Sequence, residues 1–171
     1  MDESEKTSEY NSYLSFKLGN EYFAAHVNNV INILELTEIT PVPKSPDFMK
    51  GVINLRGTVL PIIDTRLKFG MDETKYSPNT CILVLNVLID KEMVSLGALV
   101  DNVQEVLKID VKDIKPAPSI GNKYKPEFIN GIIQWEDHFI MILDADRVFS
   151  VTESSEILEA VSSEECEPET K

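Results

Sequence analysis

Few side chains in this sequence could carry out chemistry. The chain has two histidines, His26 and His138, and a histidine can act as a general base or ligate a metal ion. Neither has a cysteine or a second histidine at ligand spacing, so we expect no metal site and no catalytic histidine. Cys81 opens an apolar run, where burial would raise the pKa of its thiol. We favour a structural thiol there over a nucleophile.

Asp64 and Asp144 could form a pair of acid/base carboxylates. Each precedes a short segment of helical character, residues 65–69 and 145–149, where an aspartate is a suitable N-cap. Equivalent positions in two repeated units usually lie far apart, so we favour capping over acid/base catalysis.

The glycines do not indicate a phosphate site. Gly51, Gly57 and Gly131 are outside any Gly-x-Gly-x-x-Gly or Gly-Lys-Ser/Thr sequence. We interpret them as turn and bulge glycines. The sequence therefore predicts no catalytic residue and no cofactor.

The elements that would carry these residues occur twice. Residues 48–64 align without a gap with residues 128–144, and residues 27–30 and 41–43 correspond more loosely to residues 100–103 and 116–118. The identical pairs are Phe48/Phe128, Gly51/Gly131, Ile53/Ile133, Ile62/Ile142, Asp64/Asp144 and, further on, Phe69/Phe149. The whole structural plan is duplicated.

Each copy predicts about five strands. The first hairpins cover residues 13–27, turning at Gly19-Asn20, and residues 82–100, turning near Asp90-Lys91. The second hairpins turn at Arg56-Gly57 and at Glu136-Asp137.

Five strongly curled strands can close and remove their edges. We therefore expect an all-β fold with short helices: two pseudo-symmetric five-stranded SH3-like β-barrels packed around a shared hydrophobic core. The expected boundaries are an acidic tail over residues 1–11, barrels over 12–76 and 77–151, a C-terminal helix over 152–163 and an acidic tail over 164–171.

The charge excludes some partners. The net charge is −13, but residues 1–9 and 153–171 hold eleven acidic and two basic side chains, which leaves 18 acidic against 14 basic residues between them. Such a surface lacks the basic stripe that binds nucleic acid or anionic lipid. The N-terminus has no basic and hydrophobic leader, and the longest apolar stretch, residues 82–89, is far below bilayer length. We expect a cytoplasmic protein with no membrane insertion.

Two features suggest an interface. Arg56 lies at a hairpin turn where the second copy has Glu136; it is either a solvated arginine or an interface contact. Apolar residues also recur every three positions in both copies, at Val27, Val30 and Ile33, and at Val100, Val103 and Val106. This rhythm fits either ordinary core or a short turn that exposes apolar edges.

The sequence resembles the CheW family of chemotaxis coupling proteins. The resemblance rests on residues 48–57, which contain Asn54-Leu55-Arg56-Gly57, on Pro61-Ile62-Ile63-Asp64, and on residues 66–69. Residues 100–103, the corner at 114–118 and the Gly131 block follow in the family order, so the match runs from about Tyr13 to Phe149.

This resemblance implies a non-catalytic adaptor that joins the cytoplasmic tips of chemotaxis receptors to the histidine kinase CheA. Barrel ends of the adaptor and of the kinase's CheW-like regulatory domain could meet head to tail. A helical receptor tip would bind along the seam between the barrels. We expect the isolated protein to be monomeric and to be recruited to membrane receptor arrays.

Carried over by position, the resemblance implies two contact sets. Receptor-side contacts would be Arg56, Val103 and Val106, and kinase-side contacts would be Val30, Ile33 and Gly51. Asn32 departs from the family pattern, in which an acid is common there. Two alternatives are an adaptor of a non-flagellar chemosensory pathway and a small-barrel nucleic-acid binder, the second disfavoured by the near-neutral charge.

Overall fold

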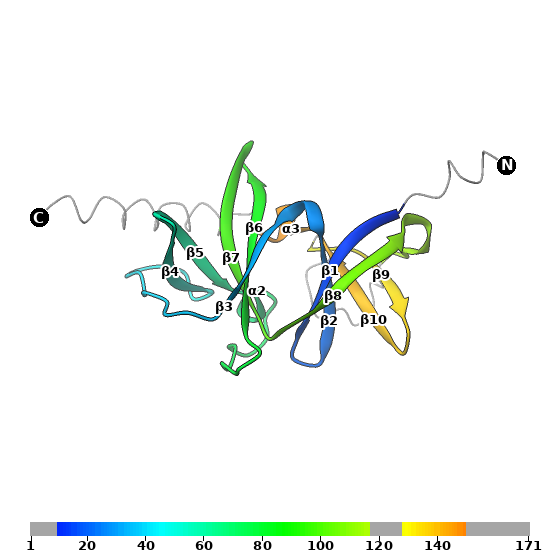
Figure 1. The fold of residues 1–171 in the computed structure, drawn as a ribbon, viewed down its shortest axis with the longest axis horizontal. Coiled ribbons are helices and arrows are strands. Elements are labelled where there is room, and N and C mark those ends of the chain that lie inside the picture. The colour runs from blue at the N-terminus through cyan, green and yellow to red at the C-terminus, as the bar shows by residue number, and fades with distance from the viewer. Residues whose placement is uncertain (1–9, 117–127, 150–171) are drawn as a thin grey trace, which may run out of the picture.

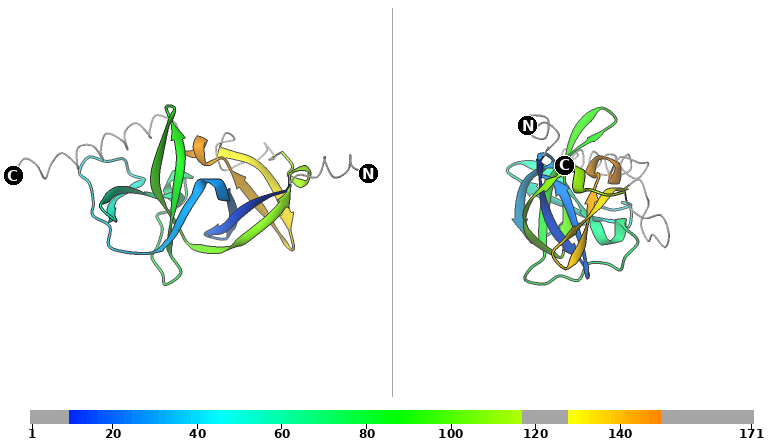
Figure 2. Two further views of the ribbon diagram at one scale, coloured as in Figure 1. Left: turned by 45° about the horizontal axis from the view of Figure 1, so that its top comes forward. Right: turned by 90° about the vertical axis from the view of Figure 1, so that its right-hand side faces the viewer.

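The computed structural model of the chain describes residues 10–116 and 128–149. Its strands form two five-stranded sheets, here called barrel A and barrel B, which lie side by side along the long axis (Figures 1 and 2). Barrel A has the strand order β8 (Asn102–Asp110), β1 (Tyr10–Leu18), β2 (Glu21–His26), β10 (His138–Leu143) and β9 (Ile129–Trp135). Barrel B has the order β3 (Val30–Glu35), β6 (Cys81–Ile89), β7 (Glu92–Val100), β5 (Thr58–Asp64) and β4 (Met49–Leu55).

Each sheet closes through a segment that follows one of its edge strands, β3 in barrel B and β8 in barrel A. In barrel B, the backbone of Thr40 exchanges hydrogen bonds of 2.9 and 2.8 Å with Val52 of β4. In barrel A, Lys115 makes the same exchange with Ile132 of β9, at 2.9 and 2.8 Å. Each closure joins the two edges of a sheet through one bridge, which pairs part of the edge backbone that would otherwise promote aggregation. The all-β fold with two barrels is thus confirmed.

The strands do not follow the expected division into residues 12–76 and 77–151. The first hairpin, β1–β2, leaves its own half and pairs with β8 and β10, while the hairpin β6–β7 pairs with β3 and β5. The two exchanges are equivalent, because β2 pairs with β10 and β7 pairs with β5 in parallel in both barrels. A strand's hydrogen-bonding groups are the same whichever half supplies the partner, so the repeat alone does not define the pairing.

Local sequence accounts for the turns. Arg56 and Gly57 have φ of 54° and 86°, and Asp90 and Lys91 have φ of 51° and 69°. Two successive positive φ angles are those of a type I′ turn, which matches the twist of the flanking strands. In the first of these turns, the side-chain oxygen of Asn54 also accepts a hydrogen bond of 2.8 Å from the Gly57 amide.

Two short helices follow the second hairpins, α2 (Thr65–Lys68) and α3 (Ala145–Val148). Asp64 caps α2 by accepting from the amides of Arg66 and Leu67, and Asp144 caps α3 by accepting from the amide of Arg147. The capping interpretation is therefore confirmed for both aspartates. The 3-10 turn η1 (Val27–Asn29) precedes β3, and the 3-10 turn η2 (Val111–Asp113) follows β8.

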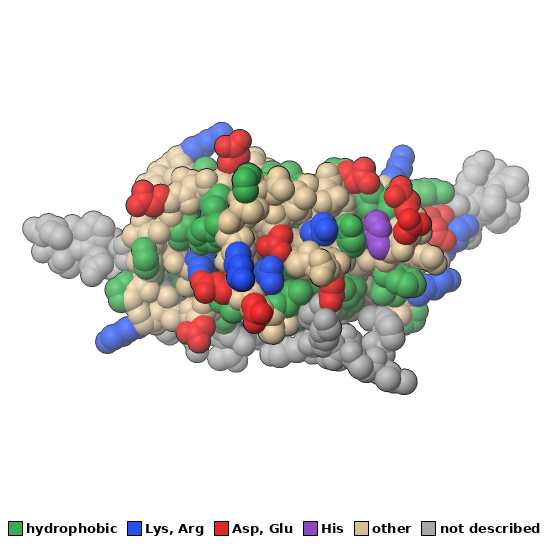
Figure 3. Space-filling view, turned by 90° about the horizontal axis from the view of Figure 1, so that it is seen from below, with side chains coloured by type: hydrophobic (Ala, Val, Ile, Leu, Met, Phe, Trp, Pro, Cys, Tyr) green, Lys and Arg blue, Asp and Glu red, His purple; other side chains and the backbone are tan. Residues whose placement is uncertain are grey.

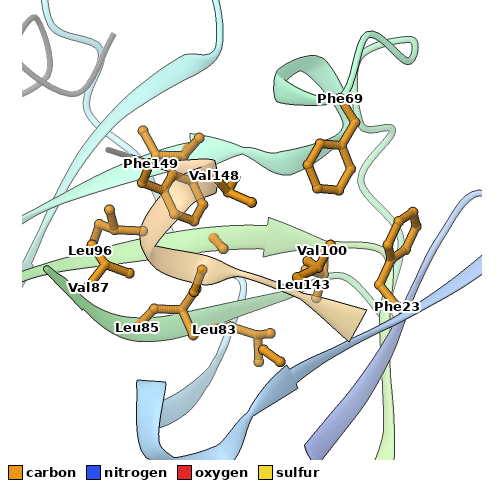
Figure 4. Close-up of a cluster of buried hydrophobic side chains, with 14 of the residues drawn as sticks. Phe23, Phe69, Leu83, Leu85, Val87, Leu96, Val100, Leu143, Val148 and Phe149 are labelled. Atoms are coloured by element: carbon orange, nitrogen blue, oxygen red, sulfur yellow. The ribbon is translucent and has the colours of Figure 1, made fainter. Parts of the chain in front are cut away.

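Three apolar clusters lie among the residues that the structure describes. One lies inside barrel A and includes Leu107 and Ile140, and a second lies inside barrel B and includes Leu60 and Ile82. The largest joins the barrels and contains side chains from the β1–β2 and β6–β7 hairpins, from α3 and from Phe69, which follows α2 (Figure 4). Its labelled members in that view are Phe23, Phe69, Leu83, Leu85, Val87, Leu96, Val100, Leu143, Val148 and Phe149. The expected shared core is confirmed.

The chain ends differ in part from expectation. β1 begins at Tyr10, so residues 10 and 11 belong to a strand and not to the expected tail. The expected C-terminal helix over residues 152–163 and the tail over 164–171 lie outside the described residues. Within the described part, no helix has the length and hydropathy needed to cross a bilayer.

Candidate interaction surfaces

The residues that could have carried chemistry have structural contacts. The Nδ1 atom of His26 accepts a hydrogen bond of 3.0 Å from the Asn28 amide and so caps η1. The His138 ring stacks on Tyr22 with 3.8 Å between ring centroids. Partial burial raises the pKa of the Cys81 thiol, which keeps it protonated and weakly nucleophilic. Among the described residues, no three His, Cys, Asp or Glu side chains are grouped to hold a metal ion.

Gly51 lies in the wall of barrel B and not on its surface. It is buried, has φ of 146°, and an added Cβ atom would overlap the backbone carbonyl of Thr40. Gly131 has the equivalent place in barrel A, where a Cβ atom would lie 2.7 Å from the carbonyl oxygen of Lys115. Both glycines permit the backbone contact that closes a barrel. Any effect of Gly51 on partner binding is therefore indirect.

The three-residue rhythm divides into core and surface positions. Val30 and Val103 are half-buried and pack against the shared core. Ile33 and Val106, the next in each series, are 44% and 60% exposed. Of these four residues, only Ile33 and Val106 are largely exposed. In the first copy, Val27 begins the 3-10 turn η1 and Val30 directly follows it. The spacing of three residues there reflects a short turn, as the short-turn interpretation predicts.

Arg56 lies at the tip of the β4–β5 hairpin and is exposed. It belongs to barrel B, whereas Val103 and Val106 belong to β8 of barrel A. The expected receptor-side set is thus divided between the two barrels. The expected kinase-side residues Val30 and Ile33, by contrast, both lie on β3 of barrel B.

Ile31 is an exposed apolar residue that the sequence reasoning did not select. It lies on β3 two positions before Ile33 and is 54% exposed. Two large aliphatic side chains on one face of an edge strand are typical of an interaction surface. The sequence pattern does not distinguish Ile31, because Val30 and Leu34, on the other face of the strand, are also apolar.

The seam between the barrels is filled by their shared core. Phe69 of the segment after α2 lies with its ring centroid 5.4 Å from that of Phe23 and 5.7 Å from that of Phe128, and all three are buried. At these residues the seam is therefore packed core. Seen from below, acidic and basic side chains are interspersed with apolar ones on the molecular surface (Figure 3).

Comparison with known proteins identifies the family. A family model described as the CheW-like domain matches residues 12–153. The chain belongs to the CheW family. Among curated CheW-family proteins, "Chemotaxis protein CheW" of Klebsiella aerogenes is 34% identical over 141 residues, covering 82% of each chain. "Chemotaxis protein CheW" of Rhizobium meliloti is 35% identical over 136 residues, covering 80% of this chain and 85% of the relative.

The fold also matches a solved CheW structure. The scaffolding protein TtCheW from Thermoanaerobacter tengcongensis superposes with a TM-score of 0.74 at 29% sequence identity. The match covers 85% of this chain and 91% of that chain. The agreement extends over both barrels, because neither barrel alone spans that share of the sequence.

Proposed function

We propose that this CheW-family protein is a non-catalytic adaptor that couples chemotaxis receptors to the histidine kinase CheA. The observation that carries the proposal is the match of the CheW-like domain over residues 12–153, together with the likeness to a scaffolding protein over both barrels. The relatives named above are chemotaxis proteins. An adaptor of this kind would be recruited to receptor arrays at the membrane and be monomeric on its own.

The kinase-side residues lie together on barrel B, whereas the receptor-side residues are divided between the two barrels. On barrel B, the exposed Ile31 and Ile33 of β3 form the apolar centre of a kinase-binding surface, supported from behind by Val30 and, through barrel closure, by Gly51. On barrel A, the exposed Val106, backed by Val103, is the apolar part of the receptor-binding surface. Arg56, on the β4–β5 hairpin of barrel B, is a separate charged contact for the receptor.

The exposed position of Arg56 allows a direct test. Histidine tolerates positive φ better than most residues, so Arg56→His should keep the turn and remove the guanidinium. The matched control is Lys91→His, which changes another exposed cation at a type I′ turn. Both variants are added to receptor-containing vesicles with CheA, and kinase activity is measured as phosphate transferred.

The proposal expects Arg56→His to lose most receptor-dependent kinase activation and Lys91→His to retain it. A second pair of variants tests binding to each partner separately. Ile33→Asp should weaken capture of CheA by the immobilised protein, and Val106→Asp should weaken capture of receptor fragments. Wild-type activation by Arg56→His together with wild-type capture by Ile33→Asp and Val106→Asp would rule out these surfaces. Capture of neither partner by the wild-type protein would rule out the coupling function.

A further inference from the structure

A small cavity lies at the mouth of barrel A. Its volume is about 110 Å³, and all five strands of the barrel contribute to its lining. The residues that shape it are Ser15 of β1, Tyr22 of β2, Glu105 of β8, Trp135 of β9 and His138 of β10. Leu107 and Ile140, which belong to the core of this barrel, also line it. Mouths of β-barrels are common places for ligand sites.

The aromatic wall of the cavity is held in place by its neighbours. His138 stacks on Tyr22 at 3.8 Å between centroids and 21° between planes, and it pairs with Trp135 across β9 and β10. On the β1 side, Lys17 pairs with Tyr22 and its Nζ atom lies 5.2 Å from the ring centroid. Because β2 lies between β1 and β10, Tyr22 is supported from both sides. The wall is preorganised and loses little freedom on binding.

Two carboxylates border the same cavity. Glu105 and Glu136 both line it, and neither forms an ion pair with any of the residues that the structure describes. The backbone of Glu105 is anchored to the Ser15 hydroxyl, which donates to its carbonyl at 2.8 Å and accepts from its amide at 3.1 Å. Aromatic faces next to unpaired carboxylates attract a cation.

The equivalent positions of barrel B lack this chemistry. At the offset of 80 residues, Trp135 corresponds to Leu55, His138 to Thr58, and Glu136 to Arg56. The two barrels share their strand order and closure, so the fold does not require an aromatic and acidic mouth. The composition of the cavity is specific to barrel A.

The volume of the cavity limits its ligand. Sites for free small molecules usually measure roughly 300–1,000 Å³. A cavity of about 110 Å³ instead suits the head group of one side chain. We infer that the mouth of barrel A binds the guanidinium of an arginine side chain presented by a partner protein. A planar guanidinium can stack on Trp135 while its N–H groups donate to Glu105 and Glu136. This subsite does not depend on the adaptor function proposed above.

The sole tryptophan of the chain, Trp135, allows a direct measurement. The full-length protein is titrated with the peptide acetyl-Gly-Arg-Gly-amide while the fluorescence of Trp135 is recorded. The comparison peptide carries citrulline, which has nearly the shape of arginine but no charge. The arginine peptide should give a saturable change in the millimolar range, and the citrulline peptide should give none.

Variants test the carboxylates. Glu105→Gln and Glu136→Gln should each raise the dissociation constant about fivefold or more. Glu92→Gln, which removes an exposed carboxylate from the hairpin of barrel B, should leave it unchanged. Trp135→Leu copies the residue of barrel B, and NMR titration should show that it no longer binds. Circular dichroism of each variant verifies that the fold is retained.

Three results would overturn the inference: the same response to both peptides, no saturable response to the arginine peptide, or unchanged affinity in both carboxylate variants. The same peptide with lysine in place of arginine should bind more weakly. Equal affinity for the two peptides would contradict the specific role of guanidinium stacking. These outcomes are independent of kinase activation and of partner capture, so they do not test the coupling function.

Discussion

The guanidinium of Arg66 in α2 lies 2.9 Å from the carboxylate of Asp101, between β7 and β8, and this ion pair links the two barrels. The same Asp101 oxygen accepts a hydrogen bond from the amide of Gly19, at the β1–β2 turn of barrel A. The Asp101 amide donates to the carbonyl of Lys17 at 3.1 Å. Asp101 therefore connects the hairpin exchanged into barrel A with the short helix of barrel B.

Replacing Asp101 should destabilise the arrangement of the barrels. Asp101→Ala removes the partner of Arg66 and of the Gly19 amide, both partly buried, and should lower the free energy of unfolding by about 1–3 kcal/mol. Urea denaturation measures the change. As a control, Glu92→Gln removes an exposed carboxylate outside these contacts and should have no measurable effect. Equal stability of the two variants would contradict the structural role of Asp101.

The two capping aspartates should differ in their contribution to stability. Asp64 is fully buried and accepts hydrogen bonds from the Arg66 and Leu67 amides and from both the amide and the hydroxyl of Thr74. Asp144 is less buried and caps only the Arg147 amide. Asp64→Ala should therefore cost about 3 kcal/mol and Asp144→Ala about 1 kcal/mol, measured by urea denaturation. The reverse order would be inconsistent with these contacts.

The barrel-closing glycines should not tolerate a side chain. In Gly51→Ala, the new methyl group overlaps the Thr40 carbonyl at a φ of 146°, so the free energy of unfolding should fall by at least about 2 kcal/mol. Gly131→Ala should behave similarly because of the Lys115 carbonyl. Gly57→Ala is the control: its φ is 86°, but nothing lies within 4 Å of the added atom. There the cost should be only about 1 kcal/mol of backbone strain. Thermal denaturation distinguishes the three variants.

Cys81 should react slowly with thiol reagents. Its thiol pKa is raised, chiefly by burial, so less thiolate is present at neutral pH than in a free cysteine. Cys166, the other cysteine of the sequence, is first replaced by serine so that only Cys81 can react. Alkylation of this variant by iodoacetamide should be slower than that of glutathione at pH 7. The rate should increase with pH up to values above the ordinary cysteine pKa. A rate equal to that of glutathione across this range would contradict the burial argument.

Several surface residues could be selected from the sequence because their context is local. Arg56 is exposed because a two-residue turn forces it to the hairpin tip, and the turn is evident from Arg56-Gly57 between apolar runs. Exposure of Ile33 and Val106 required the structure, since an aliphatic residue in an apolar strand can face either side. The cavity of barrel A was also beyond sequence reasoning, because Tyr22, Glu105 and Trp135 are far apart in the chain and meet only when the barrel closes.

The sequence by itself determined the repeated units, most strand and turn positions, and the caps at Asp64 and Asp144, because alternation, glycine turns and capping depend on residues close together in the chain. The tertiary structure decided which strands pair. A backbone hydrogen bond can form with a strand from either half of the chain. The apolar faces of the β1–β2 and β6–β7 hairpins can likewise be buried against either half. In the exchanged pairing each hairpin contributes one face to a barrel core and the other to the core that joins the barrels.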